Sequence, residues 1–323
     1  RLHNIAEAMD AFQRGLARLP RGPSQLRGDA LARLVALYMA QFDLENARRY
    51  AQMAVENSRH LHNVWHEQTV LAMLGNIKHL GCDWKGAITD YEAALALAVQ
   101  IGDRSVHAAM ETNLGVAHAN LGNMDAALAH LTNGLNLCRQ SHLRSSELKT
   151  QLAVSKLYMR LGRWADAENH LNAAEELVES TASGEAQFHL PLILSARAEL
   201  RLLTGHIEEA TAIAARSVAL AIAQDKHVDL AVCQRVQGQI LMARGEYQQA
   251  RTLLERSLPL LEDRHRFEAA KSQVVLGQAL TKTGDAVRGA ELIAQARATF
   301  TALDAKFELA DLAHLSTLQV EQS

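Results

Sequence analysis

Two stretches decide the fold of this chain: Gly162-Arg163-Trp164-Ala165-Asp166-Ala167 and Gly245-Glu246-Tyr247-Gln248-Gln249-Ala250. Each has a glycine, an aromatic residue two positions later and an alanine three positions after that, so both are the same turn. The final small residue recurs along the whole chain at intervals of 39 to 43 residues, at Ala8, Ala47, Ala87, Ala127, Ala167, Ala210, Ala250 and Gly289. A regular interval of this size indicates a repeat protein.

Other small residues keep step with this marker. Twelve positions before it stand Gly75, Gly115, Ser155, Ala198, Gly238 and Gly277. A helix hairpin explains the pattern, because a small residue in the first helix lets the second helix approach closely. The turn glycines are Gly122, Gly162, Gly205, Gly245 and Gly284. We expect them to end the first helices in a left-handed conformation, which glycine adopts at little cost.

The composition agrees with helices and limits the partners. Hydrophobic residues make up 48% of the chain, aromatic residues only 4%, and there are four prolines, which favours helices packed through Ala and Leu. A net charge of −3 lacks the positive footprint of nucleic-acid binding, so we expect no direct nucleic-acid partner. Cys82, Cys138 and Cys233 are odd in number and far apart, which indicates reduced thiols and a cytoplasmic location. With neither a long apolar run nor a signal pattern, we expect no membrane partner.

As a set, the residues resemble the tetratricopeptide repeat (TPR) family. The shared features are Leu-Gly in the first helix, as in Leu74-Gly75, then Gly-x-aromatic at the turn and spaced small residues in the second helix. The resemblance covers essentially the entire chain. Its interval is near 40 residues where the common form has about 34, as in MalT-like activators and the sensor regions of bacterial signal-transducing (STAND) NTPases. It implies an all-α fold, a right-handed α-solenoid (superhelix) of tandem helix hairpins.

The register of the repeats predicts how the chain is organised. We expect one solenoid over residues 1–323, with hairpins from about 25 to 303. A helix from about 4 to 19 and a terminal helix from about 306 to 321 lack their hairpin partners. These orphan helices, and Arg1 in place of methionine, predict a segment excised from a longer protein with adjoining domains. The longest interval accommodates Ser180-Thr181-Ala182-Ser183-Gly184, which we expect to be a soft joint.

The resemblance also nominates a binding face. In this family the first helices line the concave wall that faces a ligand or partner. The corresponding positions here are Asn76, His79, Thr112, Asn120, Lys149, Lys156, Arg160, Ser195, Glu199, Arg235, Gln239, Lys271, Gln278 and Lys282. Toward the C-terminus this set is mainly basic, so it could receive an acidic peptide, a carboxylate or a phosphate. The alternative is that the wall is polar only because water fills it.

Motifs for other chemistries are weak. His62 and His66 are spaced to share a metal on a helix, but the zinc-protease pattern is incomplete and a helix junction is predicted there, so we expect no metal site. The sequence contains neither the Gly-x4-Gly-Lys-Ser/Thr loop of NTPases nor the Gly-x-Gly-x2-Gly loop of dinucleotide-binding enzymes, so we expect no cofactor. Trp84 and Trp164 stand at the turn position and are expected to pack between helices, which leaves only Trp65 free for binding.

The predicted function is therefore recognition, with no catalytic residues and no enzyme activity. The resemblance implies a sensor or recognition arm of a larger bacterial signalling or regulatory protein, either a STAND NTPase or a MalT-like regulator. Its partner would be a peptide, a protein or a small anionic ligand in the concave groove. The alternative is a passive scaffold that holds protein partners together.

Overall fold

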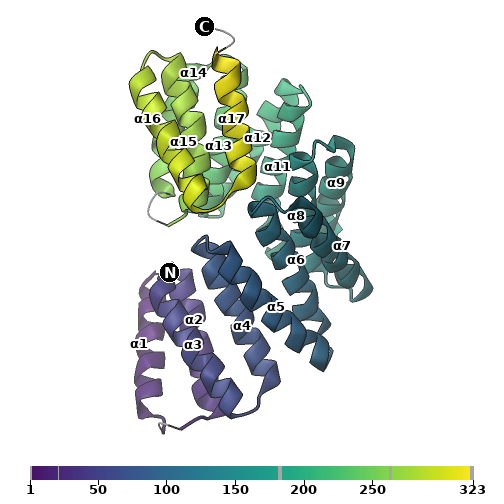
Figure 1. Ribbon diagram of the computed structural model, residues 1–323, viewed down its shortest axis with the longest axis vertical. Helices are drawn as coiled ribbons and strands as arrows, with labels where there is room; N and C mark the ends of the chain where they lie inside the picture. The colour runs from purple at the N-terminus through teal and green to yellow at the C-terminus, as the bar shows by residue number, and fades with distance from the viewer. Residues whose placement is uncertain (1, 21, 181–183, 262–263, 321–323) are drawn as a thin grey trace. The chain divides into compact units, whose positions relative to one another are not determined.

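The computed structural model describes residues 2–20, 22–180, 184–261 and 264–320, and in this part of the chain every regular element is a helix (Figure 1). The helices fall into two compact units, Arg1–His118 and Ala119–Ser323. The first contains α1 (Leu2–Arg18), α2 (Gln25–Ala40), α3 (Leu44–His60), α4 (Val64–Leu80), α5 (Trp84–Ile101) and most of α6 (Arg104–Asn120).

The second unit carries the rest of the chain. Its elements are α7 (Met124–Gln140), α8 (Arg144–Arg160), α9 (Trp164–Ser180), α10 (Gly184–Gln187), α11 (Leu190–Leu203), α12 (Ile207–Ala223), α13 (His227–Ala243), α14 (Tyr247–Ser257), the 3-10 helix η1 (Leu258–Leu260), α15 (Arg266–Lys282), α16 (Ala286–Ala302) and α17 (Lys306–Val320).

The all-α class and the tandem hairpins are confirmed. In the first unit α2 packs on α3 and α4 on α5, and in the second unit α8 packs on α9, α11 on α12, α13 on α14 and α15 on α16. The expected orphan helices are α1 and α17. Of the expected soft joint, residues 181–183 lie outside the described part, between the end of α9 and the start of α10.

The turns confirm the role of glycine and extend it. Gly122 and Gly162, with φ of 79° and 68°, end their helices in the left-handed region, as predicted. Six other links place a non-glycine residue there with φ between 51° and 63°, namely Phe42, His62, Cys82, His142, Asp225 and Asp304. Gly81 stands one residue before the position of the other turn glycines, and there Cys82 takes the left-handed conformation. The repeat imposes this conformation whatever residue is present, at a cost of roughly 1–2 kcal/mol.

The marker residues lie where the two helices of a hairpin touch. Ala47, Ala87, Ala127 and Ala167 are completely buried. Gly75 faces the ring of Tyr91, and a Cβ added at Gly75 would lie 2.4 Å from two ring carbons. A methyl group does not fit at that distance, so glycine permits the close approach.

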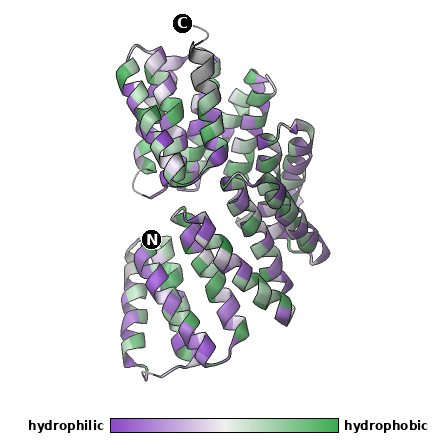
Figure 2. Ribbon diagram, in the orientation of Figure 1, coloured by the Kyte–Doolittle hydropathy of each residue, from purple (hydrophilic) through white to green (hydrophobic). Residues whose placement is uncertain are grey.

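Each unit has its own apolar core. In the first unit the core includes Tyr38 and Tyr50, whose rings stack with centroids 5.3 Å apart. In the second unit the core residues include Leu171, Ile193 and Leu254. Hydrophilic and hydrophobic residues are interspersed along the helices, as Figure 2 shows. Among the described residues, no helix combines the length and the apolar character needed to cross a membrane.

Candidate functional site

A charged cluster lies on the first helices of the hairpins in the second unit. It consists of Lys156, Arg160, Arg235, Glu268, Lys271 and Glu308. These residues come from α8, α13, α15 and α17. The sequence analysis nominated the four cations but not the two carboxylates. With four cations and two carboxylates, the charged cluster has an excess of two positive charges, and the sequence analysis described this part of the wall as mainly basic.

Glu268 is the centre of one half of the charged cluster. Its carboxylate lies 2.6 Å from Lys271 Nζ and 3.3 Å from Arg235 Nη2. Burial opposes ionisation of Glu268, but the charges of Lys271 and Arg235 outweigh it and hold the pKa at about 2. The Lys271 ammonium also lies 4.7 Å from the centre of the Phe267 ring. Glu268 is therefore ionised at neutral pH and holds two cations in place.

Arg160 is the centre of the other half. Its Nη2 pairs with Glu308 Oε1 at 2.7 Å, and its Nη1 donates to the carbonyl of Ala119 at 2.8 Å. Its guanidinium carbon lies 5.0 Å from the centre of the Phe307 ring. Arg160 and Glu308 are 148 positions apart, with the first helices α11, α13 and α15 between them. The first-helix face of the second unit therefore curves enough for α8 and α17 to meet.

Several buried polar atoms on this face lack a hydrogen-bond partner. They include Arg235 Nε and Glu308 Oε2, on side chains that are each 9% exposed, and Gln239 Oε1, one turn after Arg235 on α13. An unsatisfied buried polar group costs about 1–3 kcal/mol. Burial also raises the pKa of Glu308, although Arg160 and Lys271 act in the opposite direction. The charged cluster therefore has unused hydrogen-bonding capacity and a positive excess, which suit an anionic, hydrogen-bonding ligand.

The other nominated residues of the second unit differ in burial. Asn120 ends α6, directly after the carbonyl that Arg160 contacts. Glu199 and Gln278 are half-buried, whereas Lys149 and Lys282 are exposed.

The nominated residues of the first unit are placed differently. Asn76 Oδ1 accepts hydrogen bonds from the Tyr91 hydroxyl at 2.9 Å and from Asn113 Nδ2 at 3.1 Å, so this side chain is engaged within its own unit. His79, one turn further along α4, has no partner at its buried Nδ1. Burial lowers the pKa of His79 to about 4, so this imidazole is neutral at physiological pH.

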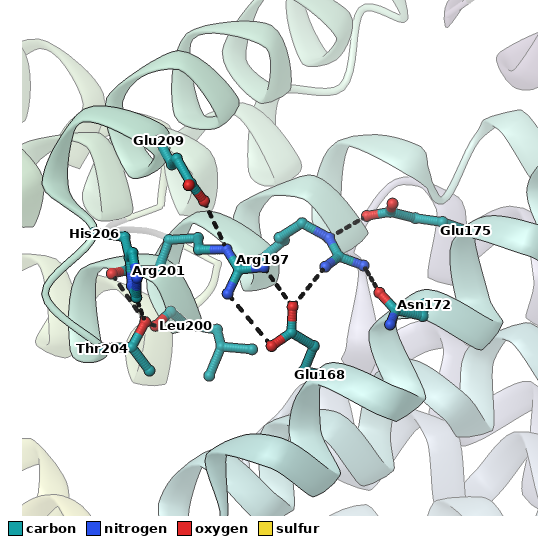
Figure 3. Close-up of polar contacts among 9 residues, drawn as sticks. All are labelled: Glu168, Asn172, Glu175, Arg197, Leu200, Arg201, Thr204, His206 and Glu209. Atoms are coloured by element: carbon teal, nitrogen blue, oxygen red, sulfur yellow. Dashed lines mark hydrogen bonds and ion pairs between the residues drawn. The ribbon is translucent and has the colours of Figure 1, made fainter.

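A separate polar network holds α11, the first helix between α8 and α13, against α9 (Figure 3). Arg197 donates from Nε to Glu175 at 2.6 Å and from Nη2 to Asn172 at 2.8 Å. Arg201 pairs with Glu168 and, at 3.0 Å, with Glu209 of α12. Both arginines are therefore satisfied by contacts inside the solenoid, in contrast to Arg235.

Other sites are weaker. His66 is buried, with its Nδ1 2.6 Å from Ser58 Oγ, and the described residues contain no group of three or more His, Cys, Asp or Glu able to hold a metal. Trp84 packs as expected with 2% exposed, whereas Trp164 keeps 37% of its surface accessible, so its packing is only partial.

A mainly apolar cleft of about 320 Å³ lies between α1 and α2, lined by residues such as Phe12 and Leu26.

The repeated hairpin, its packing residues and its polar first-helix face define a tetratricopeptide-type helical-repeat protein. The chain belongs to the family of MalT-like TPR regions, whose family model matches residues 1–298. A comparison of the sequence with curated proteins found no match.

Solved structures share the fold at low sequence identity. NprR in complex with its cognate peptide NprX is 14% identical with a TM-score of 0.69, over 98% of this chain and 89% of NprR. A Rap protein complexed with competence and sporulation factor is 12% identical with a TM-score of 0.60, over 99% of each chain. The STAND protein PH0952 from Pyrococcus horikoshii, which has a tetratricopeptide repeat sensor, is 12% identical with a TM-score of 0.58, over 94% of this chain and 46% of PH0952.

Proposed function

We propose that this chain is the recognition arm of a larger bacterial regulatory protein, of the MalT-like or STAND type, and that it binds an acidic peptide across the charged cluster of the second unit. The observation that carries the proposal is the unpaired, buried Arg235 Nε beside a cluster with excess positive charge. A carboxylate supplies the acceptors that this guanidinium lacks.

The relatives of known structure support a peptide as the ligand. Two proteins share the fold over nearly the whole of this chain: NprR, which was solved with its cognate peptide NprX, and a Rap protein, which was solved with competence and sporulation factor. The sensor role is supported by PH0952, in which a similar repeat array belongs to a longer signal-transduction ATPase. A passive scaffold would have no need of a buried arginine with unused donors.

The test is fluorescence anisotropy of a labelled Glu-rich nonapeptide, with inorganic phosphate as a competitor. Losing a charge-assisted hydrogen bond costs about 1.5–3 kcal/mol, so Arg235→Gln should weaken binding by about 10- to 100-fold. Arg244→Gln is the matched control, because Arg244 lies just beyond the end of the same helix. Its contacts are solvent-accessible ones, with the carboxylates of Glu246 and Glu208 and the Thr211 hydroxyl. Equal binding by both variants would reject the site.

The same titration separates the recognition arm from a scaffold. If neither the Glu-rich peptide nor phosphate binds at millimolar concentration while large protein partners do, the scaffold function is favoured and the charged cluster is not the ligand site.

A further inference from the structure

We infer that the end of α8 is a recognition site for an aromatic residue followed directly by an acidic residue, and that the chain's own Phe307-Glu308 fills this site in the structure. This inference rests on the proposed function, because it names the residue pair within the peptide that the charged cluster would take.

The first step is the set of contacts around Arg160. Its Nη2 lies 2.7 Å from Oε1 of Glu308, and its guanidinium carbon lies 5.0 Å from the centre of the Phe307 ring. Its Nη1 donates a third contact, a hydrogen bond of 2.8 Å to the carbonyl oxygen of Ala119. Consecutive residues of a helix point about 100° apart, so Arg160 has to lie between these two side chains to reach both. One arginine therefore contacts two neighbouring side chains: the aromatic ring of Phe307 by a cation–π interaction and the carboxylate of Glu308 by an ion pair.

The second step is the space that the fold leaves for this pair. Gly122, in the link before α7, has φ of 79°, and a Cβ added there would lie 2.9 Å from the Cβ of Lys306. A side chain at this position would push the start of α17 away from Arg160. Gly122 thus both closes its own turn and leaves room for the segment that presents Phe307 and Glu308.

The third step is that the resident pair is an imperfect occupant. Glu308 uses only Oε1, and its Oε2 is buried without a partner. Phe307 is half-buried, although Leu312 in the same helix is almost fully buried. The Phe307 ring is therefore incompletely enclosed in this site. A peptide that is free to adjust its backbone can satisfy both carboxylate oxygens, and it would displace the resident pair.

The experiment uses the full 323-residue chain and a labelled peptide that copies residues 304–312, added in trans. In the wild-type chain the resident pair competes with the peptide. The double change Phe307→Ala with Glu308→Gln should empty the site and strengthen peptide binding at least 10-fold. Adding Arg160→Gln to this double variant should remove the gain. A control peptide with the same two substitutions should bind no variant.

A second variant guards against a folding defect. Gly122→Ala leaves Arg160, Phe307 and Glu308 unchanged, but its new Cβ would meet Lys306 and displace the start of α17. It should therefore strengthen binding of a shorter peptide that copies residues 307–312 and so lacks Lys306. If the double variant loses its helical circular dichroism signal, Gly122→Ala decides the question alone.

The outcomes separate the two proposals. If the Glu-rich peptide binds through Arg235 but neither variant gains affinity for its test peptide, 304–312 for the double variant and 307–312 for Gly122→Ala, the proposed function stands and this inference is wrong. The inference is also wrong if the gain persists without Arg160. If no peptide binds any form of the chain, both proposals fail.

Discussion

Replacing Gly75 by alanine tests whether close helix packing, rather than turn chemistry alone, defines the repeat. The new Cβ would lie 2.4 Å from two carbons of the Tyr91 ring and 3.1 Å from a third, where carbon atoms normally keep about 3.5–4.0 Å. The ring cannot move easily, because it is 1% exposed and its hydroxyl donates to Asn76. The two helices of this hairpin therefore have to separate.

The magnitude follows from three opposing effects. Overpacking of a core costs about 1–3 kcal/mol, and weakening the Tyr91 hydrogen bond costs about 1 kcal/mol more. Alanine regains about 0.8–1 kcal/mol of helix propensity over glycine. We therefore expect Gly75→Ala to lower the free energy of unfolding of the first unit by about 1–3 kcal/mol.

Two other glycines provide graded controls. Gly15, within α1, has no atom within 4 Å of an added Cβ, so Gly15→Ala should stabilise by up to about 1 kcal/mol. Gly238 faces three side-chain carbons of Leu254 at 3.1 Å, a gap that a small shift can open, so its alanine variant should be nearly neutral.

Urea unfolding followed by circular dichroism, with hydrogen exchange to resolve local opening, would measure these differences. If Gly75→Ala is as stable as Gly15→Ala, then steric contact with Tyr91 is not what demands glycine, and the packing argument for the small residue twelve positions before each marker is wrong.

Three further predictions concern charge. The pKa of His79 is lowered to about 4 in the folded chain, so as the pH falls below 6.5 the unfolded chain takes up the proton first. The free energy of unfolding, measured by urea titration, should therefore drop by about 3 kcal/mol between pH 6.5 and 4. The drop should be smaller in His79→Gln. Glu268→Gln should cost about 2 kcal/mol at pH 7 by leaving two cations uncompensated. The pKa of Glu268 is depressed from 4.5 to about 2, so the difference in the free energy of unfolding between Glu268→Gln and the wild-type chain should vanish as the pH falls through that range. A difference that persists at pH 2 would exclude a charge effect. Arg197→Lys should lower the melting midpoint by the equivalent of about 1–2 kcal/mol, because lysine cannot reproduce its forked contacts. Arg244→Lys should leave the midpoint nearly unchanged, because its ion pairs are solvent-exposed, and equal losses in the two variants would contradict this prediction.

The hairpins were predictable because their signals are local. A turn glycine such as Gly162, an alanine such as Ala167 and the small residue twelve positions earlier all act within one pair of helices. Links such as Phe42 and Asp225 escaped prediction, since there the left-handed conformation is imposed by the packing of consecutive helices and not by the residue type.

The sequence by itself determined which residues stand on the first helices, because helical periodicity and the repeat register assign a face to every position. The resemblance to tetratricopeptide repeats, in which the first helices line the binding face, then nominated Arg160, Arg235 and Lys271. Only the tertiary structure decided that Glu268 and Glu308 neutralise part of that charge. The contact between Arg160 and Glu308 spans 148 positions and depends on curvature accumulated over several hairpins. No local pattern encodes that curvature, because each repeat contributes only a small rotation relative to the next.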